Sequence, residues 1–418
     1  MTNYNMLGHN FKRGIFNFCS KLSKGFYRPT QKFIVNMIYG LLSSQSSYLT
    51  EIARNLKEGI VLDKTVERLS RNLMNFDGAD KLTENYIKSV KQNFDDSTIL
   101  IIDDSDISKP CSSKLEGLCK VRDGSTGEIA DGYWYAGISA LTAEQKQPIP
   151  VYSRVYSSIE EGYISNNAET LKSFKFLSSH FSNTMIRALD RGYDAGYVFD
   201  YFIPREETFI VRMNDRNILH KGKTILLSKL AKRFKGQYGY AFAFQKKNGK
   251  KANCKISIVP VSLPSYPDTK LNLIICNGLG KTPLLLLTNL GSHDRRLCVT
   301  ITKVYLMRWR IEEYYKFKKQ IFGFEKFLVR SLQSIRNLDL FISIAIGYIG
   351  KLSEKINESI QVHEIIQASK RLYGLSKFTF YSIAYGLHEI FSKLYSGISS
   401  FFHRPSLHSN QFYLKGWA

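Results

Sequence analysis

The sequence predicts a mixed α/β protein with a sheet-forming middle and helical regions at both ends. Apolar residues recur at helical spacing up to about residue 90 and again between 335 and 395, whereas residues 98–102 form a continuous apolar run. Such a run is typical of a strand that is buried on both faces. The chain has 418 residues, of which 44% are hydrophobic, so more than one domain is expected.

The N-terminal region contains two short predicted helices, at residues 47–56 and 63–73, with a turn at Gly59 between them. Asp63 is the expected N-cap of the second helix. The buried stripe of that helix is expected to consist of three apolar residues, Val66, Leu69 and Leu73.

The second of these helices also carries three basic residues, Lys64, Arg68 and Arg71. Two short helices across a tight turn, with a basic second helix, are similar to a helix-turn-helix DNA reader, in which Arg68 and Arg71 would contact DNA. The alternative is an ordinary helical hairpin with a basic exposed face.

The middle of the chain alternates between strands and helices. Four strands are predicted after the first, at residues 132–143, 149–156, 184–189 and 208–213. A helix at 168–181 and a short helix or turn at 197–203 separate the later ones. This succession predicts a mixed sheet.

Residues 215–297 are β-rich. Asn248-Gly249 lies between two strand-like segments, 240–244 and 252–259, and Asn-Gly in such a place is the strongest local signal for a hairpin. Two more strands are expected at 271–276 and 284–288.

A helix is predicted over residues 304–319, and four of its polar residues are spaced to share one face. Tyr305, Arg308, Glu312 and Lys319 fall within about 60° of one another at about 100° per residue. Lys316, at roughly +20° on the same wheel, extends this face. A hydroxyl, a guanidinium, a carboxylate and ammonium groups together suit a site that holds a metal ion and grips phosphates.

Carboxylates also follow two predicted strands: Asp103 and Asp104 after the first, and Asp190 after the strand at 184–189. Ligands tend to bind outside the carboxyl ends of strands in open α/β sheets. Carboxylates there, together with Glu312, would suit Mg²⁺ or Mn²⁺. The alternatives are ordinary: a strand-end Asp is commonly a turn or helix cap, and a Glu in a lysine-rich helix commonly forms a surface ion pair.

The charge balance indicates a polyanionic partner. Lys and Arg number 59 against 36 Asp and Glu, a net charge of +23, which favours DNA. No membrane association is expected, because the charge is spread along the chain and the most apolar stretch, residues 340–350, is too short to span a bilayer. The N-terminal residues lack the pattern of a signal peptide, so a cytoplasmic protein is expected.

These motifs resemble those of bacterial insertion-sequence transposases of the DDE type, in the group with a Tyr-x₂-Arg-x₃-Glu-x₆-Lys signature. Tyr305, Arg308, Glu312 and Lys319 fill that pattern. An Asp-Arg-Gly segment after a strand is matched at 190–192, and an Asp-x-Ser segment after an apolar strand at 103–105.

The resemblance covers roughly residues 95–335 and implies a ribonuclease-H-like mixed sheet interrupted by a β-rich insertion, with helical N-terminal and C-terminal regions. The expected divisions are a helical DNA end-binding domain (1–94), the first part of the catalytic core (95–214), the insertion (215–297), the core helix with the third acid (298–334) and a helical region for dimerisation or DNA contact (335–418).

The resemblance also implies the chemistry. Asp103, Asp190 and Glu312 would bind two Mg²⁺ or Mn²⁺ ions, for cleavage at the ends of a mobile element and joining to target DNA. Four residues would contact phosphates or DNA: Tyr305, Arg308, Lys316 and Lys319. The implied partners are double-stranded DNA, as terminal inverted repeats and target, and a second protomer in a homodimeric synaptic complex associated with the bacterial nucleoid.

Two questions stay open at this point. Asp104 is the alternative first acid, because neighbouring strand residues point to opposite faces; Asp103 fits the Asp-x-Ser spacing and is favoured. The alternative functions are a stand-alone ribonuclease-H-like nuclease that cuts but never joins DNA, and an inactive DNA-binding derivative.

Overall fold

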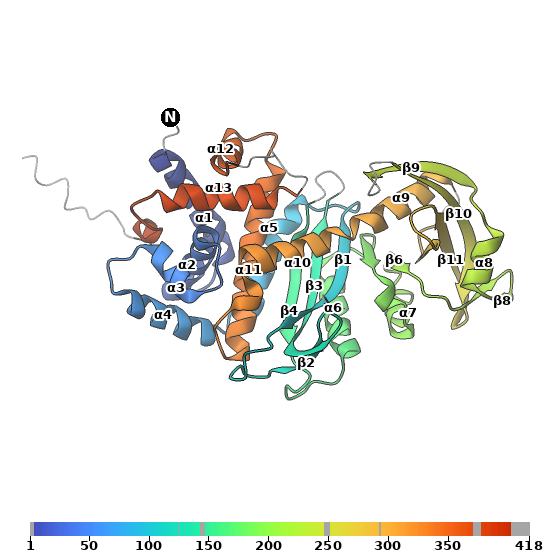
Figure 1. Cartoon of the computed structure of the whole chain (residues 1–418), viewed down its shortest axis with the longest axis horizontal. Coiled ribbons are helices and arrows are strands. Elements are labelled where there is room, and N and C mark those ends of the chain that lie inside the picture. The colour runs from blue at the N-terminus through green and yellow to red at the C-terminus, as the bar shows by residue number, and fades with distance from the viewer. Residues whose placement is uncertain are drawn as a thin grey trace, which may run out of the picture.

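One continuous sheet runs through the molecule, and helices gather at one end of it (Figure 1). The computed structural model describes residues 4–124, 126–142, 147–245, 251–291, 294–370 and 378–402. Within those ranges the sheet has twelve strands, in the order β2-β3-β1-β5-β6-β12-β11-β10-β7-β8, with β4 paired to β3 and β9 to β10. The strands are β1 (Ile99–Ser108), β2 (Cys119–Arg122), β3 (Ile129–Leu141), β4 (Ile149–Tyr156), β5 (Ile186–Leu189), β6 (Phe209–Arg212), β7 (Asn217–His220), β8 (Lys223–Leu226), β9 (Tyr238–Gln245), β10 (Lys251–Leu263), β11 (Tyr266–Asn277) and β12 (Leu284–Thr288). The predicted mixed α/β class is confirmed.

The first half of the sheet combines antiparallel and parallel pairing. β1 pairs antiparallel with β3, and β3 pairs antiparallel with β4. On its other side β1 pairs parallel with β5, and β5 with β6. Residues 99–102 of β1 are all buried, as their continuous apolar pattern predicts for a strand covered on both faces.

Helices cover both faces of this half of the sheet. Two successive residues of β4 show this. Ser153 contacts Ser343 of α11 (Leu332–Glu354), whereas Arg154 pairs with Glu169 of α6 (Asn166–His180). Because side chains alternate between the faces of a strand, α6 and α11 lie on opposite sides. The short helix α7 (Gly196–Phe202) connects β5 to β6.

The N-terminal and C-terminal helices form one helical body, which the blue and red segments of Figure 1 make visible. Helix α11 contacts α2, α4 and α5, and α13 contacts α1 and α2. The helices of this body are α1 (Tyr4–Leu22), α2 (Arg28–Ser44), α3 (Leu49–Leu56), α4 (Leu62–Met74), α5 (Ala79–Val90), α11, α12 (Ile360–Ala368) and α13 (Phe380–Ser392). None of the helices in the described ranges is both long and apolar enough to cross a bilayer.

The two helices predicted at 47–56 and 63–73 correspond to α3 and α4, with two differences. Helix α4 begins at Leu62 after Val61, so Asp63 lies in its first turn instead of capping it. The buried residues of α4 are Thr65, Leu69 and Leu73, whereas Val66 is half-buried.

Residues 217–288 extend the sheet instead of forming a separate one. β12 pairs antiparallel with β6, and β11, β10 and β7 follow in turn. β9 and β10 pair antiparallel, as the Asn-Gly signal predicts, although the turn itself, residues 246–250, lies outside the described residues. The short helix α8 (Leu227–Arg233) follows β8.

Candidate functional site

A polar hollow of about 440 Å³ opens where β1 and β5 meet the helix that follows the β-rich segment. Its lining residues come from distant parts of the sequence. They are Asp103, Asp104, Ser105, Asp190, Arg308, Glu312, Tyr315, Lys316, Lys319 and Gln320. The structure therefore brings together the three predicted acids, the alternative first acid and three of the four predicted basic or hydroxyl partners.

The strand register explains why Asp103 and Asp190 meet. β1 and β5 run parallel, and their last register pair is Ile102 with Leu189. Asp103 and Asp190 are each the next residue along, so both lie at the same level, where the pairing of β1 with β5 ends. Asp190 follows β5 as predicted, but Asp103 does not follow its strand: β1 continues through it to Ser108, paired with β3. The Asp190 carboxylate accepts a hydrogen bond from the backbone N–H of Gly192 at 2.6 Å, which ties it to the turn that follows β5.

Asp103 and Asp104 face different neighbours. The Asp103 carboxylate lies 3.4 Å from the Arg308 guanidinium, and its backbone carbonyl accepts a hydrogen bond from the Tyr315 hydroxyl at 2.7 Å. The Asp104 carboxylate accepts a hydrogen bond from Thr170 of α6 at 3.4 Å. Both line the hollow, but Asp103 is the one directed at the helices that carry Arg308 and Glu312.

The helix predicted over 304–319 is in fact two helices, α9 (Arg295–Met307) and α10 (Arg310–Ile321). Across the junction the backbone bonds change from i→i+4 to i→i+3: Arg308 N–H donates to Tyr305, and Glu312 N–H donates to Trp309. Such bonds wind the chain by about 120° per residue instead of 100°. The single narrow face predicted for the four motif residues is therefore wrong at its first member.

Tyr305 is that member. It lies on α9, is buried, and does not line the hollow. Its hydroxyl is hydrogen-bonded with Arg212 and Arg308. Tyr305 therefore contacts Arg308 without itself lining the hollow. The remaining motif residues, Arg308, Glu312 and Lys319, do share a face with Lys316, because α10 is regular from Arg310 onward.

Arg308 lies between two of the acids. One guanidinium nitrogen is 3.4 Å from Asp103 and another is 3.1 Å from Glu312. The Arg308 side chain is 13% exposed, whereas that of Glu312 is 46% exposed. Arg308 thus bridges Asp103 on β1 and Glu312 on α10 at the inner side of the hollow.

Lys319 is held by its surroundings, whereas Lys316 is exposed at the rim. The Lys319 ammonium lies 2.7 Å from Glu325 and donates to the Asp106 carbonyl at 3.2 Å. Both lysines add positive charge beside the carboxylates.

Burial, more than any neighbouring charge, raises the pKa values of the two acids on β1. Burial raises the pKa of Asp103 to about 8; the Arg308 guanidinium opposes this, and the charges of Asp190, Asp104 and Glu312 add to it. Asp104 is exposed to the hollow, yet the protein around it desolvates its carboxyl enough to raise its pKa to about 6. Clustered carboxylates of this kind favour a bound cation.

The donor set suits a hard divalent cation, because four carboxylates line one hollow, the three predicted ligands and Asp104. As the side chains stand, however, no three acid, His or Cys side chains among the described residues are grouped closely enough to hold a metal ion. The space between Asp103 and Glu312 is taken by Arg308. The residues fit Mg²⁺ or Mn²⁺ in chemistry, and Arg308 has to move for Asp103 and Glu312 to share an ion.

Arg68 and Arg71 are not part of this site. They lie on α4 in the helical body, and they differ in surroundings. Arg68 forms a partly buried ion pair with Glu58, in the turn between α3 and α4, whereas Arg71 is exposed. The structure thus ties Arg68 into the α3–α4 turn.

Two supporting residues were not predicted. Tyr315 holds the Asp103 backbone, and Lys318 forms a buried ion pair with Asp339 of α11 while also donating to the Tyr135 hydroxyl at 2.9 Å. Helical spacing from Tyr314 and Phe317 could have indicated that Lys318 lies near the buried side of α10. Its partner on α11 left no signal in the sequence.

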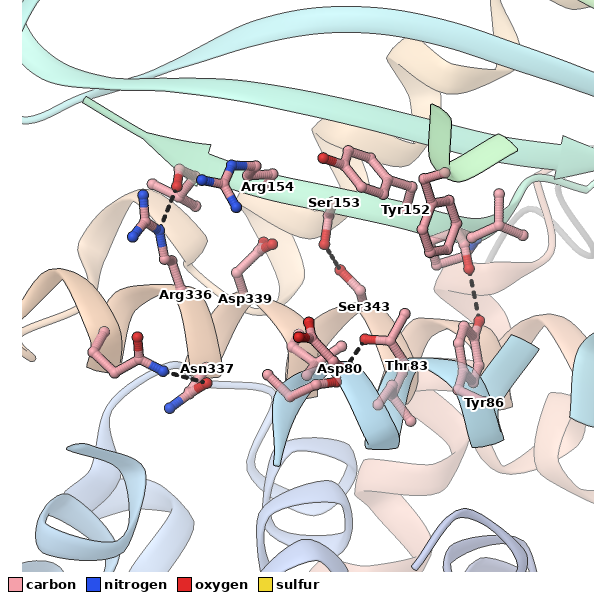
Figure 2. Close-up of a pocket in the computed structure, with 18 of the residues that line it drawn as sticks. Asp80, Thr83, Tyr86, Tyr152, Ser153, Arg154, Arg336, Asn337, Asp339 and Ser343 are labelled. Carbon is pink, nitrogen blue, oxygen red and sulfur yellow. Dashed lines mark hydrogen bonds between the residues drawn. The ribbon is translucent and has the colours of Figure 1, made fainter. Parts of the chain in front are cut away.

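A second hollow, of about 370 Å³, lies between α5, β4 and α11, and Figure 2 shows the side chains that face it. Most of its charged groups already have protein partners. Arg336 pairs with Glu160 at 2.6 Å, Arg154 with Glu169 at 2.9 Å, and Asp339 with Lys318. This hollow is accordingly a weaker candidate for a reaction site than the one between β1, β5 and α10.

Comparison with known proteins adds little. No family model matches the chain, and no curated protein sequence matches it. Among solved structures, the chain is similar to the cryo-EM structure of the piggyBac transposase synaptic complex with hairpin DNA. The TM-score is 0.42 and the identity 10%, over 90% of this chain and 74% of that one. At this distance the likeness carries no conclusion about the activity of this chain.

Proposed function

We propose that the chain is a DNA transposase of the DDE type, from a bacterial insertion sequence, acting on cytoplasmic DNA as a homodimer. One observation carries the proposal: carboxylates from β1, β5 and α10 line one hollow together with Arg308, Lys316 and Lys319. Acids alone would suit many cation sites, but acids bordered by fixed cations suit a metal-assisted reaction on a phosphodiester.

The strand order supports the same proposal. In the strand order β4-β3-β1-β5-β6, β3 is antiparallel to both of its neighbours, β4 and β1, whereas β5 and β6 run parallel to β1. This is the order expected of a ribonuclease-H-like core, and Asp103 and Asp190 lie on its two neighbouring central strands, where the pairing of β1 with β5 ends. The net charge of +23 favours a nucleic-acid substrate.

In the proposed mechanism Asp103, Asp190 and Glu312 would hold two Mg²⁺ or Mn²⁺ ions, once Arg308 has moved from between Asp103 and Glu312. When bound, such ions supply activation of a water or 3′-hydroxyl and stabilisation of the leaving oxygen. Arg308 binds a phosphate beside the cut through its planar fork, and Lys319 and Lys316 add point charges. Tyr305 orients Arg308 from behind, and Tyr315 fixes the backbone that carries Asp103.

The decisive experiment uses Glu312→Gln with Glu313→Gln as its matched control. Glu313 is the next residue, pairs with Arg310, and does not line the hollow. With Mn²⁺ and duplex DNA that carries the sequences flanking the coding region, we expect cleavage to be abolished in the first variant and retained in the second. Equal cleavage by both variants would disprove the three-carboxylate mechanism.

The same reaction separates the alternatives. Joining of the cut 3′-end to a second duplex identifies a transposase, whereas cleavage without joining identifies a stand-alone nuclease. A parent protein that binds the DNA but neither cuts nor joins it would be the inactive derivative.

A further inference from the structure

A third concave surface lies in the helical body, apart from the carboxylates. It is a pocket of about 250 Å³ formed by α1, α11 and the start of α12. Three of its lining residues are lysines: Lys21 in the last turn of α1, and Lys351 and Lys355 at the end of α11. No acid lines it.

The three lysines lack a neutralising partner in the pocket. None of them forms an ion pair with a carboxylate in the part of the chain that the structure describes. Lys351 lies in the last turn of α11 and Lys355, four residues further on, is its C-cap, an arrangement in which like charges repel. The carboxylate nearest to them in sequence, Glu354, is bound by Asn93 at 2.6 Å and does not line the pocket.

The electrostatics reflect this crowding. Burial lowers the pKa of Lys351, and the charges of Lys21 and Lys355 lower it further, whereas Glu354 acts in the opposite direction. An anion between the three ammonium groups would relieve the repulsion.

The rest of the lining suits an oxyanion. Asn10, Asn17, Ser359 and Gln361 offer amide and hydroxyl groups, and the last two belong to the N-terminal end of α12. The aromatic residues of the lining are all buried, so they offer no open ring face for a base to stack on. The lysine, amide and hydroxyl groups of the pocket therefore suit a phosphate group and not a nucleic-acid base.

We propose that Lys21, Lys351 and Lys355 bind backbone phosphates of duplex DNA at a site separate from the carboxylate hollow. The inference rests on the proposed function only in taking DNA as the substrate. Lys21 and Lys355 are exposed, and a pocket open to solvent accommodates a continuous phosphodiester chain. Phosphate binding of this kind fixes the position of a duplex without reading its sequence.

The test compares Lys21→Gln/Lys355→Gln with Lys88→Gln/Lys120→Gln in the full-length protein. All four lysines are exposed and both pairs remove two charges, but Lys88 and Lys120 are ion-paired with Glu84 and Asp131. Duplex binding is measured against salt in EDTA, so that no cleavage occurs. Removal of the pocket lysines should reduce the slope of log affinity against log salt by about 0.9 for each phosphate that the protein no longer neutralises. The control pair should leave the slope unchanged.

Lysine acetylation read by mass spectrometry identifies the source of the phosphate. We expect duplex DNA to protect Lys21, Lys351 and Lys355 and not Lys88 or Lys120. Protection by inorganic phosphate without protection by DNA would overturn the proposal in favour of a small phosphate ligand. Equal salt slopes for the two double variants, or no protection at all, would also overturn it. Because EDTA is present, this result stands or falls independently of the Glu312→Gln cleavage test.

Discussion

The guanidinium of Arg308 lies 3.4 Å from the carboxylate of Asp103, in the space through which the strand acid faces the helix acid Glu312. A positive side chain thus occupies the place between two acids for which a divalent ion would compete. The same Arg308 side chain is proposed to bind phosphate once a metal ion has displaced it. The contact between Arg308 and Asp103 therefore bears on both metal binding and phosphate binding.

Arg308→Gln is expected to bind Mn²⁺ more tightly while cleaving DNA more slowly. Without the competing cation the metal affinity should improve by about tenfold, the equivalent of about 1.4 kcal/mol. Without the guanidinium on the phosphate, cleavage should slow. Isothermal titration calorimetry and a cleavage assay measure the two effects, with Arg310→Gln as the control at the same helix junction. Unchanged or weaker Mn²⁺ binding would refute the competition.

Asp103→Asn should abolish cleavage, whereas Asp104→Asn should retain most of it. The reason is direction: Asp103 contacts Arg308 and faces Glu312, and Asp104 is hydrogen-bonded to Thr170 on α6. Single-turnover cleavage with Mn²⁺ measures both. Abolished cleavage in the Asp104 variant alone would reverse the assignment.

The pKa of Asp103 should make the metal-free protein less stable as pH rises. In the folded protein this pKa is raised to about 8 from its ordinary value of 3.8, so between these values the folded state holds a proton that the unfolded state releases. Stability therefore falls with rising pH, by at most about 1.4 kcal/mol per pH unit. Urea unfolding in EDTA at pH 5 and pH 8 should show that Asp103→Asn gains stability over the parent at the higher pH. A constant difference would contradict the shift.

Lys318→Met should destabilise the protein by about 3–5 kcal/mol, because it leaves Asp339 buried without its partner. Lys318→Met/Asp339→Leu should recover much of that stability. The exposed neighbour Lys316→Met is the control and should change the free energy of unfolding by less than about 0.5 kcal/mol. Chemical denaturation compares the three, and equal stability of the two single variants would contradict the buried pair.

Arg68→Ala and Arg71→Ala should separate folding from DNA binding. Arg68 pairs with Glu58, so its removal should lower the melting temperature of the protein. Arg71 is exposed, and its removal should weaken DNA binding without changing the melting temperature. Thermal unfolding and DNA titration measure the two properties. If neither variant binds DNA less tightly, α4 is an ordinary helix of the helical body.

Much of the architecture could be predicted because its signals are local. The buried first part of β1 followed from four consecutive apolar residues, and Asp190 lies directly after β5, as predicted. The continuation of β1 through Asp103 to Ser108 was not predicted, because these polar residues are held in the strand by pairing with β3. The continuity of the sheet from β6 into β12 could not be predicted, because the antiparallel pairing of β12 with β6, in which Thr288 lies opposite Ile210, joins segments far apart in the sequence.

The sequence by itself determined the set of groups in the hollow: four carboxylates counting Asp104, a guanidinium and two ammonium groups, at spacings that strands and a helix face can present together. The tertiary structure alone decided how they are arranged. The tightened junction between α9 and α10 turns Tyr305 away, and Arg308 is drawn between Asp103 and Glu312. Helical periodicity fixes the direction of side chains within one regular helix, but the partners that a charge finds depend on which surfaces the fold brings within a few ångströms.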